Sequence, residues 1–192
     1  MRAFFIIREI DKVMMIYLIG SGGAGKTTTA QLLASQLGWD CFDLDLYFMQ
    51  TVGDISTYID QFGYAYYAQK NIECYLTIMH KVHQKGSNVI VVCSSGFMTY
   101  PEDIHLNYLE LKKQILEHSL TFVLLPSLSF EICVQEIVER QMNRSYLKAS
   151  AEKERDKIIQ RFHIYSQLPC QIMLTDVQPL QVVNNIKNNL NQ

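Results

Sequence analysis

The chain has 192 residues, of which 48% are hydrophobic and 19% are charged, and its formal net charge at pH 7 is −2. This length suits one packed core, and the balance of apolar and charged residues excludes an intrinsically disordered chain. The small net charge provides no basic field for nucleic acid, and no apolar run reaches the ~20 residues of a membrane span.

Short apolar runs alternate with helical patterns along the whole chain. Five runs predict strands, at residues 15–19, 41–45, 88–93, 120–125 and 170–174. Helical patterns lie between them, at residues 26–37, about 54–85 with a break near Gly63, 105–118, 127–142, 151–167 and 179–190. Strands that are apolar throughout are typical of a parallel sheet buried on both faces. The alternation therefore predicts a single α/β domain over residues 1–192, in which residues 1–13 form an accessory arm.

The stretch GSGGAGKTTT at residues 20–29 follows the first predicted strand and begins a predicted helix. Its residues match the pattern G-x-x-x-x-G-K-[ST] at every position. Glycines let the backbone N–H groups turn toward phosphate oxygens, and the helix N-terminus adds positive potential. In this motif the lysine, Lys26, reaches the β- and γ-phosphates, and the hydroxyl of Thr27 ligates Mg²⁺. The predicted nucleotide contacts of the loop are Gly22, Gly23, Ala24, Gly25, Lys26, Thr27 and Thr28.

The loop predicts bound ATP, but by itself it fits a kinase, a GTPase, a motor or a switch. Two carboxylates in the next predicted strand narrow the choice. Asp43 and Asp45 are two residues apart, so in a strand they point to the same side. One carboxylate can hold the Mg²⁺ shell through water, and the other can orient or deprotonate an acceptor hydroxyl. A pair of solvated carboxylates at a strand end is the alternative.

Residues 15–190 resemble the shikimate kinases, which are small-molecule kinases of the P-loop class. The stretch IYLIGSGGAGKTTTAQLLASQLGWDCFDLD is similar to that family's opening of strand, phosphate loop, helix and D-x-D strand. The resemblance implies a P-loop NTPase fold with three layers and strand order 2-3-1-4-5, ATP and Mg²⁺ as cofactors, and a small hydroxylated acceptor. It also implies that Asp43 assists the magnesium ion and that Asp45 binds the acceptor and acts as its base.

The segment ERQMNRSYL at residues 139–147 is similar to the family's lid, which we expect over about residues 139–152. The resemblance implies that Arg144 reaches the transferring phosphate and that Arg140 lies near the adenine. Mobile guanidinium groups also suit the charge that develops on a phosphoryl group, and a closing lid excludes water. Ordinary surface arginines at a helix end are the alternative.

The segment RFHIYSQLPCQIMLTDVQPLQVV at residues 161–183 is similar to the family's R-x-P-L-Y segment, last strand and adenine-side loop. The resemblance implies that Arg161 binds a carboxylate of the acceptor and that Pro179 lies beside the adenine. A single arginine on a helix face is otherwise unremarkable.

Two stretches depart from the family pattern. Where the family has a carboxylate-binding arginine in a G-E-x-x-F-R-like segment, this chain has Ala68, and Tyr64 replaces the glutamate. The family's triple glycine reads Ser94, Ser95 and Gly96. A lost bidentate contact to a buried carboxylate weakens binding by ~3 kcal/mol, which is more than 100-fold in affinity. We therefore expect an acceptor with less anionic charge than shikimate. The residues predicted to bind it are Asp45, Tyr64, Ser94, Ser95, Gly96 and Arg161.

The favoured function is an ATP-dependent small-molecule kinase whose catalytic residues are Lys26, Asp45 and Arg144. A catalytically degenerate ATP-binding protein that acts as a switch or regulator is the alternative. An enzyme acting on a nucleotide or on RNA is disfavoured, because the chain has no basic patch. Five widely spaced cysteines without a C-x-x-C pair indicate reduced thiols and a cytoplasmic location.

Overall fold

Five parallel strands form one sheet in the computed structural model, which describes residues 13–142 and 151–190. The strands are β1 (Met15–Ile19), β2 (Asp40–Asp43), β3 (Val89–Val92), β4 (Thr121–Leu125) and β5 (Gln171–Leu174). They lie in the order β2-β3-β1-β4-β5, and every neighbouring pair is parallel. The predicted number of strands and their order are confirmed. The predicted arm, except for its last residue, lies outside the described residues.

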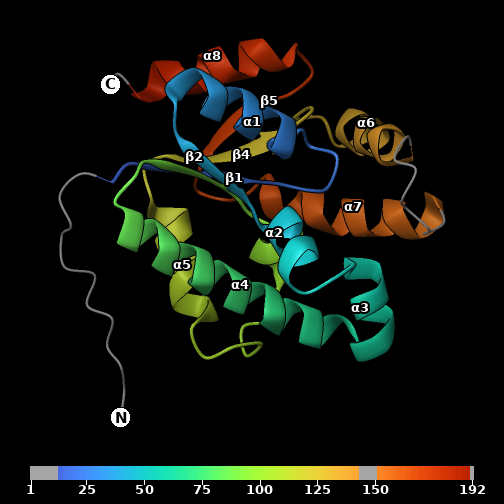
Figure 1. The fold of residues 1–192 in the computed structure, drawn as a ribbon. Helices are drawn as coiled ribbons and strands as arrows, with labels where there is room; N and C mark the ends of the chain where they lie inside the picture. The colour runs from blue at the N-terminus through green and yellow to red at the C-terminus, as the bar shows by residue number, and fades with distance from the viewer. Residues whose placement is uncertain (1–12, 143–150, 191–192) are drawn as a thin grey trace.

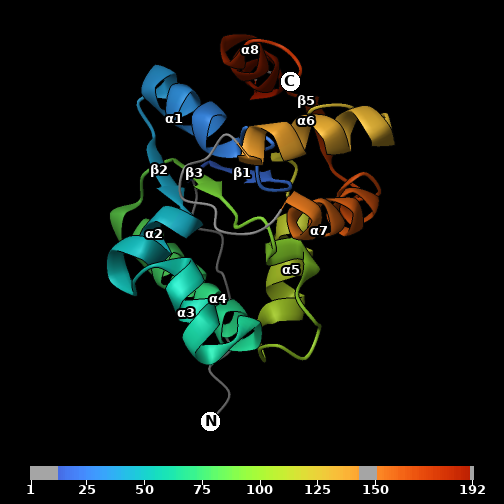
Figure 2. The ribbon, with the colours of Figure 1, turned by 90° about the vertical axis from the view of Figure 1, so that its right-hand side faces the viewer.

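Helices cover both faces of the sheet. They are α1 (Lys26–Leu37), α2 (Leu44–Thr51), α3 (Ile55–Phe62), α4 (Tyr64–Lys85), α5 (Tyr108–Glu117), α6 (Phe130–Met142), α7 (Ala151–Tyr165) and α8 (Pro179–Leu190), with a short 3₁₀ turn at Phe97–Thr99. Helices α1 and α8 lie on one face, and α4 and α5 lie on the other, as Figures 1 and 2 show from two directions. The arrangement is the predicted three-layer α/β fold.

The alternation of side chains along the central strand explains why its sequence is apolar at every position. Ile16 and Leu18 of β1 pack with the residues of α1 and α8, whereas Tyr17 and Ile19 pack with those of α4 and α5. All four side chains are buried. A strand with a helical layer on each face has no solvent-facing side, so the hydrophobic pattern cannot alternate.

Helix α2 is the main difference from the sequence prediction, which placed residues 41–45 in a strand. Strand β2 ends at Asp43, whose side chain accepts hydrogen bonds from the backbone N–H groups of Asp45 (3.0 Å) and Leu46 (3.2 Å). This N-cap starts a helix at the next residue, because it satisfies amides that have no partner in the first turn. The prediction that Asp43 and Asp45 share a strand is therefore wrong, and Asp45 lies in the first turn of α2.

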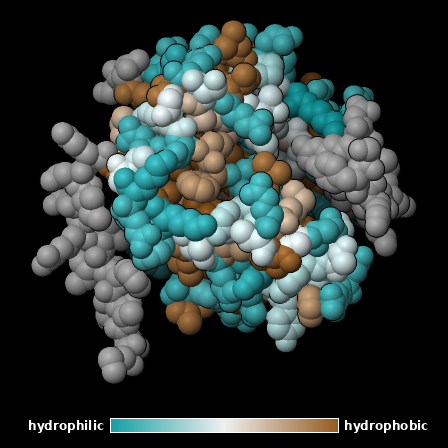
Figure 3. All heavy atoms as spheres, in the orientation of Figure 1, coloured by the Kyte–Doolittle hydropathy of each residue, from teal (hydrophilic) through white to brown (hydrophobic). Residues whose placement is uncertain are grey.

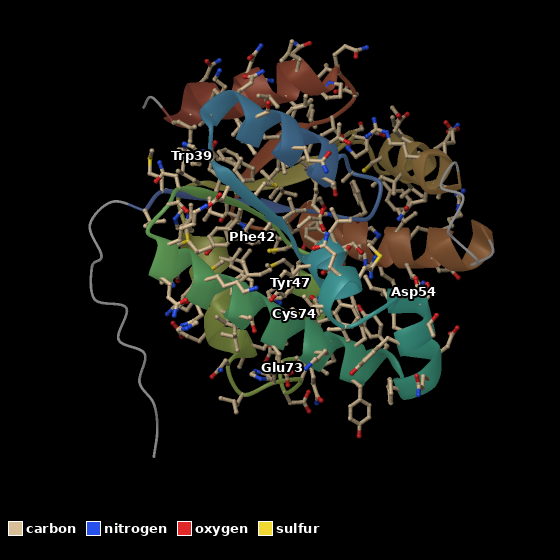
Figure 4. All side chains as sticks on the ribbon, in the orientation of Figure 1. Trp39, Phe42, Tyr47, Asp54, Glu73 and Cys74 are labelled. Carbon is tan, nitrogen blue, oxygen red and sulfur yellow. The ribbon has the colours of Figure 1, made fainter. Side chains whose placement is uncertain are left out.

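The predicted break near Gly63 is confirmed. Helix α3 begins after Asp54, labelled in Figure 4, whose carboxylate accepts from the N–H of Thr57 at 2.8 Å. It ends at Gly63, whose φ of +88° favours glycine and turns the chain into α4. Helix α2 packs on α4, where Tyr47 and Cys74 line a common surface pocket (Figure 4).

The face seen in Figure 3 is largely hydrophilic, with hydrophobic side chains in scattered patches. In the described part of the chain, no helix is both long and apolar enough to cross a membrane. All five cysteines are free thiols.

Candidate active site

The phosphate loop joins β1 to α1 and wraps around the side chain of Lys26. Gly20, Gly23 and Gly25 have φ values of +142°, +83° and +88°, which residues with a Cβ rarely adopt. The Lys26 side chain is 8% exposed, and its ammonium donates to the carbonyls of Gly20 (2.8 Å) and Ser21 (2.9 Å). The glycines therefore give the loop the curvature that an anion cradle requires, and the lysine charge lies at its centre.

A pocket of about 430 Å³ opens beside the loop, between the start of α1, the end of α6 and the segment that joins β5 to α8. Thr28 and Pro179 line it, as does Arg140. The Arg140 guanidinium donates to the carbonyl of Thr175 at 2.8 Å and forms an ion pair with Glu136 at 3.0 Å. These bonds fix it as one wall of the pocket. The structure thus brings together the residues predicted to lie near the adenine, and it adds Thr175, which no sequence motif indicated.

Thr27 and Asp43 meet at the other side of the loop. The Thr27 hydroxyl donates to Oδ2 of Asp43 at 2.5 Å, while Oδ1 of the same carboxylate caps α2. A hydroxyl and a carboxylate are ligands that suit Mg²⁺, which keeps most of its shell as water and substrate phosphate. Within residues 13–142 and 151–190, no cluster of three or more His, Cys, Asp or Glu side chains could hold a metal ion. The donor set fits an ion that is shared with a nucleotide.

The carboxylate of Asp45 faces the residues on the acceptor side. The hydroxyl of Tyr67 donates to its Oδ1 at 3.3 Å. Burial raises the pKa of the Asp45 carboxyl, while a hydrogen bond from Ser94 and the positive charge of Lys26 oppose that rise. A carboxylate that is partly desolvated in this way is a stronger proton acceptor than one in water.

Besides Asp45, five residues are predicted to bind the acceptor, and these five lie together. Arg161 donates through Nη1 to Oγ of Ser95 at 3.0 Å. A Cβ built on Gly96 would collide with the Tyr64 hydroxyl and would lie 3.3 Å from Nη2 of Arg161. The Tyr64 hydroxyl therefore lies directly against Gly96, beside the guanidinium group. Ser94 follows the end of β3 and is buried next to them.

A buried hydrogen-bond chain supports this side of the site, and sequence reasoning missed it. The Asn71 side chain is 0% exposed; its Nδ2 donates to Oγ of Ser94 at 2.9 Å, and its Oδ1 accepts from the Tyr100 hydroxyl at 3.0 Å. Because an amide nitrogen only donates, Ser94 accepts this bond and keeps its own proton for another partner. A hydrogen bond from Ser94 does contribute to the pKa of Asp45. The chain thus links α4 to the proposed base.

Two predicted features remain outside this geometry. Residues 139–142 of the predicted lid belong to helix α6, and Arg144 lies outside the described residues. Ala68, which stands where the family has an arginine, is fully buried in the core and brings no charge to the site.

Comparisons with known proteins agree with the fold. The family model described as "Shikimate kinase" matches residues 22–191. The chain is 32% identical over 98 residues to a pentafunctional AROM polypeptide of Pneumocystis carinii. This aligned stretch covers 50% of this chain and 6% of that protein. The chain is also 31% identical over 88 residues to a "Shikimate kinase 2" of Pectobacterium atrosepticum. That stretch covers 45% of this chain and 47% of that protein. These matches therefore span less than half the length of either curated relative.

Among solved structures, a shikimate kinase from Aquifex aeolicus has a similar fold. The TM-score is 0.63 at 24% sequence identity, and the match covers 93% of this chain and 96% of that chain.

Proposed function

The chain belongs to the shikimate kinase family of P-loop kinases, and we propose that it phosphorylates a hydroxyl group of a small polyhydroxylated molecule other than shikimate. Family and fold both support an ATP-dependent phosphotransferase. The observation that carries the acceptor proposal is the contact of Tyr64 and Ser95 with Gly96 and Arg161, which the family's pattern lacks.

The nucleotide contacts follow from the loop and the pocket. The backbone N–H groups of residues 22–28 bind the phosphates, and Lys26 turns from its own loop carbonyls toward the β- and γ-phosphates. Arg140 and Pro179 hold the adenine in the pocket that they line. Thr27 and Asp43 would hold Mg²⁺. When bound, this ion neutralises charge on the phosphate oxygens.

The transfer itself depends mainly on positioning and charge. Asp45 holds the acceptor hydroxyl in line with the γ-phosphorus and takes its proton. The hydroxyl oxygen forms a bond to that phosphorus as the bond to the β–γ bridging oxygen breaks, and ADP leaves. Lys26 neutralises the charge that develops on the phosphoryl oxygens, and Arg144 joins it in this role.

The acceptor carries less negative charge than shikimate, because the site offers less cationic recognition. Ala68 replaces the second carboxylate-binding arginine, and one face of Arg161 is already engaged by Ser95. An incompletely paired carboxylate would lose ~3 kcal/mol, or more than 100-fold in affinity. Tyrosine and serine hydroxyls instead suit an acceptor with several hydroxyl groups.

A switch protein that binds ATP without phosphorylating an acceptor is the second candidate. It is favoured by one observation: the Tyr64 hydroxyl already occupies the space against Gly96, and Arg161 already has a partner within the chain. Such a protein would bind ATP and release no ADP with any acceptor.

An ADP-release screen over hydroxylated metabolites distinguishes the two candidates. Lys26→Met serves as the blank, and Asp45→Asn serves as a second variant that leaves the phosphate loop unchanged. We expect acceptor-dependent ADP release that is lost in both variants, with nucleotide binding retained in Asp45→Asn. Equal release by the unaltered chain and Lys26→Met across the panel would refute the kinase proposal.

A further inference from the structure

Gln141, in the last turn of α6, lies directly on the phosphate loop. Its side chain is 6% exposed. A Cβ built on Gly22 would collide with Nε2 of Gln141 and would lie 3.3 Å from its Cδ, and a Cβ on Gly23 would lie 3.3 Å from its Cγ. The carboxamide therefore lies against Gly22 and the aliphatic part of the side chain lies against Gly23, and only a backbone without side chains lets Gln141 approach so closely.

Two buried polar atoms at this place have no hydrogen-bond partner within the described residues. They are Oε1 of Gln141 and Oγ of Ser21, the residue before Gly22. Buried polar atoms almost always have partners, and an exception calls for an explanation such as a ligand that completes them. Ser21 is part of the phosphate loop and Gln141 packs on its glycines, so a bound nucleotide, or water that accompanies it, is the group best placed to complete these atoms.

The position along the nucleotide follows from the surroundings. Successive side chains of a helix lie about 100° apart, so Arg140 points in another direction than its neighbour Gln141. The Arg140 guanidinium points into the pocket and donates to the Thr175 carbonyl. A bound nucleoside would therefore lie in the pocket that Arg140 lines. Phosphates that run from the pocket past Lys26 toward the acceptor site end near Ser21 and Gly22, where the Lys26 ammonium already lies against the loop carbonyls. A nucleotide bound along this path would place its terminal phosphoryl group beside Gln141.

We infer that Gln141 is a further nucleotide contact, whose carboxamide together with the Ser21 hydroxyl binds the terminal phosphoryl group of ATP. This inference rests on the proposed function, because it takes ATP as the donor. The amide nitrogen donates to a phosphoryl oxygen, and the amide oxygen accepts from water bound beside the phosphates. ADP lacks the group that these atoms bind, so Gln141 makes the site distinguish ATP from ADP.

Calorimetric titration with a non-hydrolysable ATP analogue (the β,γ-imido compound) and with ADP, both with excess Mg²⁺, tests this inference. Gln141→Leu removes the polar atoms at similar volume, and Gln141→Glu replaces the donor with a negative charge. Gln135→Leu, on the exposed face of the same helix, is the matched control. We expect Gln141→Leu to weaken binding of the analogue about tenfold, as the loss of one hydrogen bond to a charged group would, and to change ADP affinity less than about twofold. Gln141→Glu should weaken analogue binding more.

Thermal unfolding of the ligand-free protein provides the second readout. If the carboxamide serves the ligand, Gln141→Leu should melt no lower than the unaltered chain, because an unsatisfied buried oxygen is removed. Equal losses of affinity for the analogue and ADP, or no loss for either, would overturn the inference and assign Gln141 to loop packing. A lower melting temperature of ligand-free Gln141→Leu would count against it in the same way. If the unaltered chain bound neither nucleotide, the proposed function would fail together with the inference.

Discussion

Asp43 serves the fold with one carboxylate oxygen and the nucleotide site with the other, and two substitutions separate these roles. Oδ1 caps α2, and Oδ2 accepts from Thr27. Asp43→Ala removes an N-cap, which is worth about 1 kcal/mol, and a hydrogen bond worth about 1 kcal/mol. We expect the sum, about 2 kcal/mol, to lower the melting temperature by roughly 4–8 °C in a domain of this size. Asp43→Asn keeps an equally good cap, so its melting temperature should stay within about 2 °C.

Both substitutions remove the carboxylate that would hold the Mg²⁺ shell. We expect each to reduce the Mg²⁺-dependent gain in ADP affinity about tenfold, the value of one charge-assisted hydrogen bond, and to leave affinity in EDTA unchanged. Thermal unfolding and calorimetric titration with Mg²⁺ or EDTA measure the two effects. Asp60→Asn, at an exposed position of α3, is the control for charge alone.

Two results would contradict these two roles of Asp43. If Asp43→Asn melted as low as Asp43→Ala, the cap would not be what stabilises the start of α2. If Asp43→Asn kept the full Mg²⁺ dependence of ADP binding, the carboxylate would have no part in holding the ion.

Three further predictions concern the structure around the site. Gly20→Ala should lower the melting temperature by about 4 °C or more, because its φ is +142° and the new Cβ would lie 2.6 Å from the Leu124 carbonyl of β4. Asn71→Leu should destabilise the protein by about 2 kcal/mol in urea unfolding, since two buried hydroxyls lose their partner. Burial lowers the pKa of His118, whose Nδ1 accepts from the N–H of Leu120. The folded state therefore disfavours the protonated ring. The contribution of His118 to the free energy of unfolding is constant above a pH of about 6.5, and it falls as the pH drops below that value. His118→Asn, which keeps an acceptor that does not titrate, should flatten the fall in melting temperature between pH 7.5 and 5.5.

For each of these three predictions, one result would contradict the expected effect. An unchanged melting temperature in Gly20→Ala would mean that the loop can move away from β4. Unchanged urea stability in Asn71→Leu would mean that the hydroxyls find other partners. An identical pH profile in His118→Asn would assign the acid sensitivity to other groups.

The sheet could be predicted from the sequence because each strand is a short apolar run bounded by turn residues. Its order required the family resemblance, since strand pairing is a tertiary property. Helix α2 could not be predicted from periodicity, because the apolar residues after Asp43 continue the strand pattern of β2. What ends the strand is the cap made by the Asp43 side chain, and a short apolar run does not reveal it.

Some residues of the candidate site could be predicted from the sequence, and others could not. The phosphate loop is local in sequence, so spacing alone identified Lys26 and Thr27. Asn71 and Gln141 act through contacts with residues distant in the chain, and each looks like an ordinary polar residue on a helix. No spacing rule in a single sequence connects α6 to Gly22, and only the packed structure does.

We propose that the donor half of the family's site is intact in this chain and that its acceptor is a molecule other than shikimate. The decisive measurement is phosphate transfer from ATP labelled in the γ position to shikimate, at saturating ATP and Mg²⁺. We predict a rate at least about 100-fold below that with the best hydroxylated acceptor from the screen, as the lost carboxylate contact requires. Formation of shikimate phosphate at an ordinary kinase rate, about 1–100 s⁻¹, would contradict the claim.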